Sequence, residues 1–456
     1  MQLLRYKFVL LSLMMSFKAF ADFPTAKALF EQQEYALAKP QLETLAELGH
    51  LEAQYLLSRM YAEGLGVDPD IKLAYAWTLI ARDAEHPQAD KQYKTLRTKL
   101  PSRLAGKEVY TTLNNQYGKR ALLGNLYPNA NRYVNTSSKL KAISQPEPKY
   151  PSYFERAGVA AWAVVQYDVT EDGKVDNPNI VASFPIEGID EYVLEAVKNW
   201  TFEPPKDLYG DAIRVELQSH TFRIKSSAGS QTRKFQRDSQ EYIDAILAAA
   251  NAESAKYQYL YAVLAENNIT SDPSPMDWYL QSAINGYQPA QYRLAQCLIT
   301  GNGCDKDPSK AVNWLAISAD GGDPKAAYLL AQELLDSNNV NYNPHKAAGY
   351  LENAALQEYM PAVTEYASLL AMSDDPTLRD PQKAIRLAEQ GRAIDTNNPN
   401  LLSTLGVAFI EIGQQSRGES MLKQAIEEAK RRNWTTENFE DLLADYQTVA
   451  TSTNSL

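Results

Sequence analysis

Residues 286–290 read GYQPA, residues 322–326 read GDPKA and residues 358–362 read EYMPA, and these three segments decide the fold. Each segment begins 36 residues after the one before it. The same step separates three large aromatic residues, Trp278, Trp314 and Tyr350. A period of this length that holds two amphipathic helices is typical of a helical solenoid, in which each repeat packs only on its neighbours.

Each repeat contains two apolar stripes at helical spacing. In the repeat that begins at residue 286, the stripes are Ala290, Leu294, Cys297 and Leu298, then Ala311, Trp314, Leu315 and Ala319. This spacing places each stripe on one buried helix face. Gly301 and Gly303 lie between the two helices, where we expect a turn with positive φ.

The same pattern occurs near the N-terminus, where residues 49–81 contain Gly49, Ala53, Gly64 and Trp77 at matching positions. Both regions resemble the Sel-type repeat, a relative of the tetratricopeptide repeat. Residues 28–48 are predicted to form a preceding helical hairpin, and residues 399–429 look like an ordinary tetratricopeptide hairpin. The resemblance implies a protein-binding scaffold without catalysis of its own.

The helical pattern is interrupted in the middle of the chain. Residues 126–148 are rich in Asn, Ser and Pro, which indicates a linker. From Val159 the period becomes two, a turn follows at residues 171–174, and a second strand lies near residues 179–183. A helical stripe runs from Ile189 to Trp200, and a third strand is expected at Ile213 to Ile224. This order predicts a small α+β module with a three-stranded antiparallel sheet.

At these residues a more specific resemblance is found. It is carried by YP at 150–151, AG at 157–158, YDVTEDGKV at 167–175, VAS at 181–183, AVK at 196–198 and WTFEPP at 200–205. In order and spacing these segments resemble the C-terminal domain of TonB-type energy transducers, over residues 149–225. The predicted architecture is therefore multidomain, with α-helical solenoid repeats flanking a small α+β TonB C-terminal-like domain. The expected boundaries are a signal peptide at 1–21, repeats at 22–125, linkers at 126–148 and 226–240, and a second solenoid at 241–450.

The resemblance implies that the last strand receives an extended peptide from an outer-membrane receptor. Unpaired backbone groups at the edge of a sheet can hydrogen-bond an added strand, and alternate side chains then set its register. Edge charges oppose self-pairing, and Arg214, Glu216 and Arg223 are expected to supply them. The predicted peptide-binding edge consists of Ile213, Arg214, Val215, Glu216, Leu217, Gln218, Ser219, His220, Thr221, Phe222, Arg223 and Ile224. The alternative is that the linker or a helical array covers this edge.

The first 21 residues have the pattern of a cleavable export signal. Arg5 and Lys7 precede an apolar run at residues 8–17, and Ala19 and Ala21 form a small-x-small site before Asp22. The run is too short to span a bilayer, which needs about 20 residues. We therefore expect cleavage between Ala21 and Asp22, a periplasmic location and no membrane span in the mature chain.

The residue inventory excludes several kinds of chemistry. A formal net charge of −11 argues against a general nucleic-acid binder. Only four His and two Cys are present, and no metal-ligand spacing or catalytic motif is found, so we expect no metal, no cofactor and no enzymatic activity. Cys297 and Cys304 are seven residues apart in a chain predicted to be exported, which indicates a possible disulfide. The alternative is a pair of buried thiols.

The prediction for function is an exported adaptor for protein–protein interactions. Its TonB-like domain would bind extended peptides of envelope proteins, with TonB-dependent outer-membrane receptors among the candidates. The first alternative is an auxiliary component of energised transport across the outer membrane. A second alternative, from another class, is an envelope enzyme whose site is not recognisable in the sequence.

Overall fold

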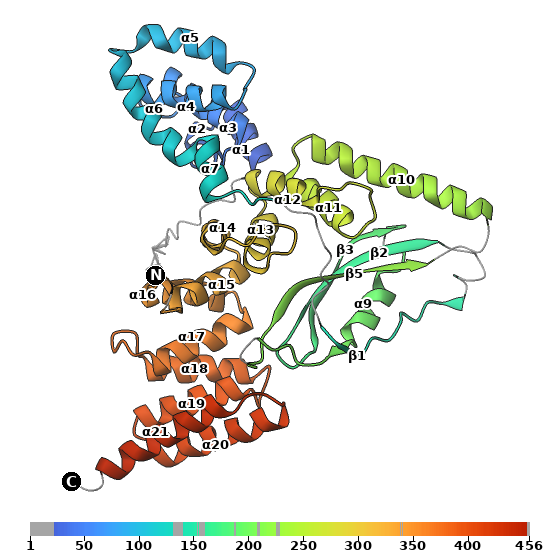
Figure 1. Ribbon diagram of the computed structural model, residues 1–456, viewed down its shortest axis with the longest axis vertical. Coiled ribbons are helices and arrows are strands. Elements are labelled where there is room, and N and C mark those ends of the chain that lie inside the picture. The colour runs from blue at the N-terminus through green and yellow to red at the C-terminus, as the bar shows by residue number, and fades with distance from the viewer. Residues whose placement is uncertain are drawn as a thin grey trace, which may run out of the picture.

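The computed structural model describes residues 22–130, 140–152, 154, 160–186, 188–207, 210–224, 229–337, 339 and 341–453. The predicted signal peptide, with Ala21, lies outside these residues, as do the AG segment at 157–158 and the central part of the first linker. The described chain consists of an N-terminal helical array, a small domain with a three-stranded sheet, and a long C-terminal helical array (Figure 1). The predicted fold class is confirmed.

The N-terminal array contains antiparallel helices joined by short turns. They are α1 (Phe23–Glu31), α2 (Tyr35–Glu47), α3 (Leu51–Glu63), α4 (Ile71–Asp83), α5 (Ala89–Lys99), α6 (Arg103–Tyr117) and α7 (Lys119–Asn125). The turn between α3 and α4 begins at Gly64, which takes φ 72° and ends α3. Leu42, Leu57 and Met60 are fully buried between the helices, as the predicted stripes require.

The C-terminal array repeats this arrangement over more units. Its helices are α10 (Gly229–Asn251), α11 (Ala255–Glu266), α12 (Pro275–Ile284), α13 (Gln288–Thr300), α14 (Pro308–Asp320), α15 (Pro324–Leu335), α16 (Pro344–Leu356), α17 (Met360–Met372), α18 (Pro381–Arg392), α19 (Pro399–Glu411), α20 (Gln415–Arg431) and α21 (Glu437–Thr453). Odd-numbered helices from α11 to α19 open the successive repeats. Ala290 and Trp314 of the best-matching repeat are completely buried.

The repeated segments begin helices because their residues suit a sharp helix start. Gly286, Gly322 and Glu358 all take positive φ, which explains why glycine is favoured at this position. Asp323 then accepts hydrogen bonds from the backbone N–H groups of Lys325 and Ala326 at 2.9 and 3.2 Å. Pro324 follows at the first helical position, where its missing N–H costs nothing.

The inserted domain contains β1 (Ala142–Ser144), β2 (Ala161–Val169), β3 (Val175–Phe184), α9 (Asp190–Lys198), β4 (Thr201–Phe202) and β5 (Val215–Ile224). β2 pairs antiparallel with both neighbours, so the strand order is β3-β2-β5. β1 pairs with β4 in a separate two-stranded sheet, so this part of the predicted linker belongs to the domain. The third strand is shorter than predicted, because Ile213 and Arg214 precede it.

Both faces of the three-stranded sheet are covered. Ala163, Val165 and Tyr167 of β2 pack with Val193 and Trp200, on the face covered by α9. Trp162 and Val164 of the same strand pack instead with residues of the C-terminal array. The Trp162 indole N–H donates to Ser239 Oγ of α10 at 2.9 Å, and the Tyr259 hydroxyl of α11 donates to Gln166 Oε1 at 3.3 Å. The predicted alternation along β2 is correct, and the solenoid buries its second face.

The linker predicted at 226–240 is shorter than expected, because α10 begins at Gly229. In the first half of this helix, Phe235 and Ser239 contact the sheet. In its second half, Ile243 and Ile246 are buried in the core that the sheet shares with the C-terminal array. Phe235 also contacts Phe184 of β3, with ring centroids 5.6 Å apart and the ring planes tilted by 53°. The helix is stabilised by covering the sheet, which the local polar composition of residues 226–240 did not indicate.

The two arrays meet at the C-terminal end of α7. The Trp314 indole N–H donates to the Leu126 carbonyl at 2.8 Å, and the Asn313 amide donates to the Asn125 carbonyl at 2.9 Å. The buried ammonium of Lys310 donates to the carbonyls of Leu123 and Tyr127 at 2.9 and 2.8 Å. Carbonyls at the end of a helix lack intrahelical partners and carry partial negative charge, so a lysine suits this position.

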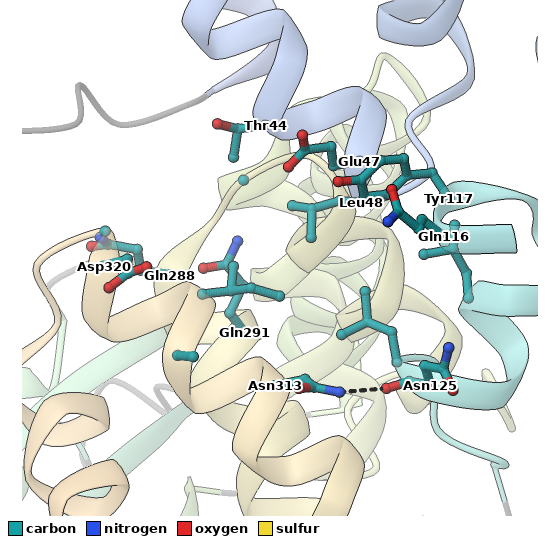
Figure 2. A pocket seen from close by; sticks show the side chains of 16 residues that line it. Thr44, Glu47, Leu48, Gln116, Tyr117, Asn125, Gln288, Gln291, Asn313 and Asp320 are labelled. Atoms are coloured by element: carbon teal, nitrogen blue, oxygen red, sulfur yellow. Dashed lines mark hydrogen bonds between the residues drawn. The ribbon is translucent and has the colours of Figure 1, made fainter. Parts of the chain in front are cut away.

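A cavity of about 430 Å³ lies at this junction. Figure 2 shows Glu47, Tyr117 and Asn125 of the N-terminal array facing Gln288 and Asp320 of the C-terminal array, together with the Asn313–Asn125 hydrogen bond. The cavity marks where the two arrays pack incompletely against each other.

The burial of both sheet faces predicts the result of a matched pair of substitutions. Val164 and Val165 are adjacent, point to opposite faces and are completely buried. We expect Val164→Ala and Val165→Ala each to lower the free energy of unfolding by about 2 kcal/mol, because both leave a cavity in a packed core. Urea denaturation followed by circular dichroism measures the loss. Wild-type stability of the Val164→Ala variant would contradict docking of the sheet on the solenoid.

The predicted disulfide can be tested directly. Cys297 in α13 and Cys304 after it have Cα atoms 5.8 Å apart, within the usual range for a bridged pair. In protein secreted to the periplasm, we expect neither thiol to be alkylated without reductant in intact-mass analysis, and both after reduction. Closing so short a loop should stabilise the fold by about 2–3 kcal/mol. Alkylation of both thiols without reductant would reject the bond.

Candidate functional site

The predicted edge strand is one of the two outer strands of the sheet. β5 pairs along its length with β2, from Ile224 opposite Ala161 to Val215 opposite Val169. Among the described strands, no second partner pairs with it. The other edge of β5 therefore faces the space between the sheet and the C-terminal array.

A cleft of about 1230 Å³ lies along this edge. One wall contains β5 and the residues just before it, and the opposite wall comes from residues in or next to α11, α13, α15 and α17. The lining residues of the opposite wall include Asn267, Arg293, Gln296, Tyr328, Leu329, Gln332, Glu333 and Glu365. The predicted peptide-binding strand is thus accompanied by a wall that belongs to the solenoid.

The solenoid wall repeats with the period of the fold. Tyr292 and Tyr328 are 36 residues apart, as are Gln296 and Gln332. Each tyrosine hydroxyl accepts a hydrogen bond from the glutamine one turn later, at 2.9 and 2.8 Å. These four residues were not among the predicted site residues. The repeat period could have identified them, because polar side chains at one helical position in successive repeats share a face.

An ion-pair cluster lies where β5 begins. The Arg214 guanidinium donates to Asp168 Oδ2 of β2 at 3.0 Å and to Asp176 Oδ2 of β3 at 2.6 Å. The Lys325 ammonium of α15 donates to the same oxygen of Asp168 at 2.7 Å. Arg214 therefore joins the strands of the sheet, and Lys325 joins the sheet to the solenoid.

Glu216 forms the second connection to the solenoid. Its carboxylate accepts hydrogen bonds from the Tyr292 hydroxyl and, at 2.5 Å, from the Tyr359 hydroxyl. The strand bulges directly after it, because Leu217 takes φ 52° and its N–H donates to Asp168 Oδ1 at 3.1 Å. The bulge interrupts the regular alternation that the sequence had suggested for the whole strand.

The expectation of exposed edge charges is therefore wrong for two of the three residues. The side chains of Arg214 and Glu216 are only 10% and 6% exposed, because their charges are neutralised inside the domain interface. Arg223 is more exposed and donates to the Asn267 carbonyl at 3.3 Å. Glu216 and Arg223 thus hold this strand against the solenoid, whereas Arg214 joins the strands of the sheet.

Burial and ion pairing act in opposite directions on the carboxyl groups of the cleft. Burial alone would raise the pKa of Asp168, but Lys325, Arg214 and the Leu217 N–H hold it below its ordinary value. Burial raises the pKa of Glu216, although Lys325, Tyr359 and Arg214 partly offset the effect. Burial also raises the pKa of Glu171 and Glu365.

The tip of the β2–β3 hairpin is attached to the far end of the C-terminal array. The Arg432 guanidinium, at the end of α20, lies 2.6 Å from Asp172 of the tip and 2.7 Å from Asp395. The Thr435 hydroxyl donates to the Gly210 carbonyl at 3.0 Å. The inserted domain thus contacts the array from α10 to the α20–α21 turn.

The remaining residues of the predicted edge differ in how far their side chains are exposed. Ser219 and His220 are exposed beside the cleft, whereas Phe222 is buried against Trp200. Burial lowers the pKa of His220, which also lies edge-on to Trp200 at 5.1 Å. The central residues Gln218, Ser219 and His220 are therefore the part of the strand nearest to an incoming chain.

In the part of the chain that the structure describes, no group of three or more His, Cys, Asp and Glu residues is placed to hold a metal ion. Within the same residues, no helix combines the length and the apolar character needed to cross a bilayer.

Two families match this chain. The model of the Gram-negative bacterial TonB protein C-terminal domain matches residues 146–224. The Sel1 repeat model matches residues 51–86, 288–323, 324–359 and 362–392, on both sides of that domain. Both predicted resemblances are confirmed, and neither matching family is catalytic.

Curated relatives match through the inserted domain alone. Protein TonB of Escherichia coli is 30% identical over 82 residues, which cover 18% of this chain and 34% of the relative. Protein TonB of Yersinia enterocolitica is 36% identical over 70 residues, which cover 15% of this chain and 28% of the relative. The chain thus spans about a third of the length of the curated relatives that it matches.

Two solved structures show a loose similarity to this chain. A protective antigen of uropathogenic Escherichia coli with an SLR fold is 16% identical, with a TM-score of 0.34, and the match covers 89% of this chain and 68% of the antigen. A Sel1 repeat protein from Oxalobacter formigenes is also 16% identical, with a TM-score of 0.35, over 44% of this chain and 85% of that protein. TM-scores this low do not establish a shared overall structure.

The ion-pair cluster predicts how stability depends on pH. The pKa of Asp168 is lower in the folded protein than its ordinary value, so ionised Asp168 stabilises the fold above the unfolded pKa of about 3.9. This contribution is lost as the pH falls through the folded pKa. We expect Asp168→Asn to lower the free energy of unfolding at neutral pH by about 3 kcal/mol, because it removes the carboxylate that pairs with Lys325 and one of the three that pair with Arg214.

The difference in the free energy of unfolding between Asp168→Asn and wild type should narrow as the pH falls below about 4. Asp168 of wild type is then protonated first in the unfolded chain and, at lower pH, in the folded protein. Urea denaturation at a series of pH values measures this difference. The control is Asp374→Asn, at an exposed residue outside the cluster, which should change stability by less than about 0.5 kcal/mol. A difference for Asp168→Asn that stays constant down to acidic pH would contradict the assigned role.

Proposed function

We propose that this chain, in which a TonB C-terminal domain interrupts an array of Sel1 repeats, is a periplasmic adaptor that binds extended peptide segments of envelope proteins. The peptide would add as a further strand to the outer edge of β5. The observation that supports the proposal most directly is that this edge borders a cleft of about 1230 Å³ rather than another strand.

Strand addition suits the chemistry of this cleft. Backbone N–H and C=O groups at an unpaired edge provide affinity for any extended chain, and the surrounding side chains provide selectivity. On the opposite wall, the amides of Gln296 and Gln332 can donate to or accept from the free edge of an added strand. A bound peptide would therefore have polar partners on both of its edges.

A second candidate function is an auxiliary role in TonB-dependent transport across the outer membrane. The similarity of the inserted domain to protein TonB of several bacteria favours it. In that case the bound peptides would come from TonB-dependent receptors. The two functions share one binding edge and differ in the partners that occupy it.

Photo-crosslinking in intact cells tests the proposal. A photoreactive amino acid at Ser219, exposed beside the cleft, should give crosslinks to envelope proteins. The same amino acid at exposed Glu427 of α20 is the matched control and should not give these products. Receptors among the crosslinked proteins would favour the transport role over a general adaptor.

A pair of substitutions at Gln218 tests whether the peptide binds through the backbone of β5. Gln218→Pro should abolish the Ser219 crosslinks and Gln218→Ala should retain them, because proline removes a backbone donor and alanine does not. Circular dichroism must show that the proline variant is folded. Undiminished crosslinking by a folded Gln218→Pro variant would exclude this edge as the binding site.

A further inference from the structure

Near the start of β5, the cleft contains more carboxyl groups than cationic side chains. Two cations, Arg214 and Lys325, lie in this region, and both are already paired with Asp168, while Arg214 also contacts Asp176 and Glu216. Two more carboxyl groups, Glu171 and Glu365, line the same cleft. The region thus places five carboxyl groups beside two cations.

Glu171 and Glu365 come from opposite walls of the cleft. Glu171 lies in the turn after β2, and Glu365 lies in α17 of the solenoid. Within the described residues, neither carboxylate is within ion-pair distance of a Lys or Arg side chain. Both are close enough to the Tyr328 hydroxyl to raise its pKa, in addition to the larger effect of burial. Both carboxylates thus belong to the part of the cleft that Tyr328 lines.

The side chains that line this part of the cleft suit a long basic side chain. Leu329 and the Tyr328 ring offer apolar surface to an alkyl stem, as lysine and arginine need when their charged ends reach a polar group. Val215 and Gln218 of the candidate binding strand line the same cleft. A side chain from a strand added to β5 would thus lie in the cleft that both carboxylates line.

We propose that the cleft selects extended peptides that carry a lysine or arginine, whose charged end lies between Glu171 and Glu365. This inference rests on the proposed function and names the ligand class of the same site. A peptide fits better than a free metal ion, because the carboxylates share the cleft with an unpaired strand edge and the described residues form no metal-ligand group. The selectivity comes from the solenoid and the inserted domain together, since each supplies one carboxylate.

The test begins with a library of random peptides as long as β5, 10 residues, displayed on phage. Selection on the full-length mature protein should enrich lysine or arginine at one position. Selection on the double variant Glu171→Gln and Glu365→Gln should enrich peptides without this preference. The control is Glu427→Gln, at an exposed glutamate of α20 outside the cleft, which should select the same basic peptides as wild type.

A selected peptide then allows a double-mutant cycle. Replacement of its basic residue by glutamine should weaken binding to wild type by about fivefold, the range of a partly exposed ion pair, and hardly at all to the double variant Glu171→Gln and Glu365→Gln. Folding is not expected to obscure the result, because each Glu→Gln change removes a charge that burial disfavours. Thermal midpoints no lower than that of wild type would verify this.

The outcomes separate this inference from the proposed function. Selected peptides that lack basic enrichment, but lose binding in the Gln218→Pro variant, would overturn the charge preference and leave strand addition intact. Basic enrichment that persists in the double variant would also overturn the assignment to Glu171 and Glu365. Peptides that bind the folded Gln218→Pro variant as well as wild type would contradict strand addition itself.

Discussion

The arrangement of this protein depends on the burial of a three-stranded sheet on both faces. All nine residues of β2 are buried, and its side chains alternate between apolar contacts with α9 and apolar contacts with the C-terminal array. A single short helix can cover only one face of a sheet. Without the solenoid, Trp162 and Val164 would be exposed to water, at a cost of roughly 25 cal/mol for each Å² of apolar surface.

The need to cover this second face places the inserted domain along the array. α10 extends across the sheet, Lys325 and Tyr359 bind carboxylates at the start of β5, and Arg432 binds the hairpin tip. Solenoids are stabilised mainly by contacts between neighbouring repeats and have few long-range contacts. The inserted domain provides such long-range contacts, because it touches repeats far apart in the array. The two helical arrays are also joined directly, where Lys310 and Trp314 bind the end of α7.

The same contacts create the cleft and determine its charge. Because Arg214 and Glu216 are used to attach β5 to its surroundings, they do not present free charges to a ligand. The carboxylates that remain, Glu171 and Glu365, are partly desolvated, and no Lys or Arg side chain of the described residues lies within ion-pair distance of them. Such groups cost stability in the free protein, and a ligand that supplies positive charge would recover part of that cost. Binding specificity and domain docking thus depend on one set of side chains.

The sequence determined the features that are local or periodic. The 36-residue step gave the helical repeats, the alternation along β2 gave its two faces, and the spacing of motifs between residues 149 and 225 gave the domain family. The tertiary structure alone decided what covers the second face, how far α10 extends, and which charges are buried. Residues such as Trp162 and Ser239, or Glu216 and Tyr359, are separated by 77 and 143 positions. A local pattern shows which side chains need a partner, but the partner is chosen by packing between distant elements, where burial changes the free energy of every charge.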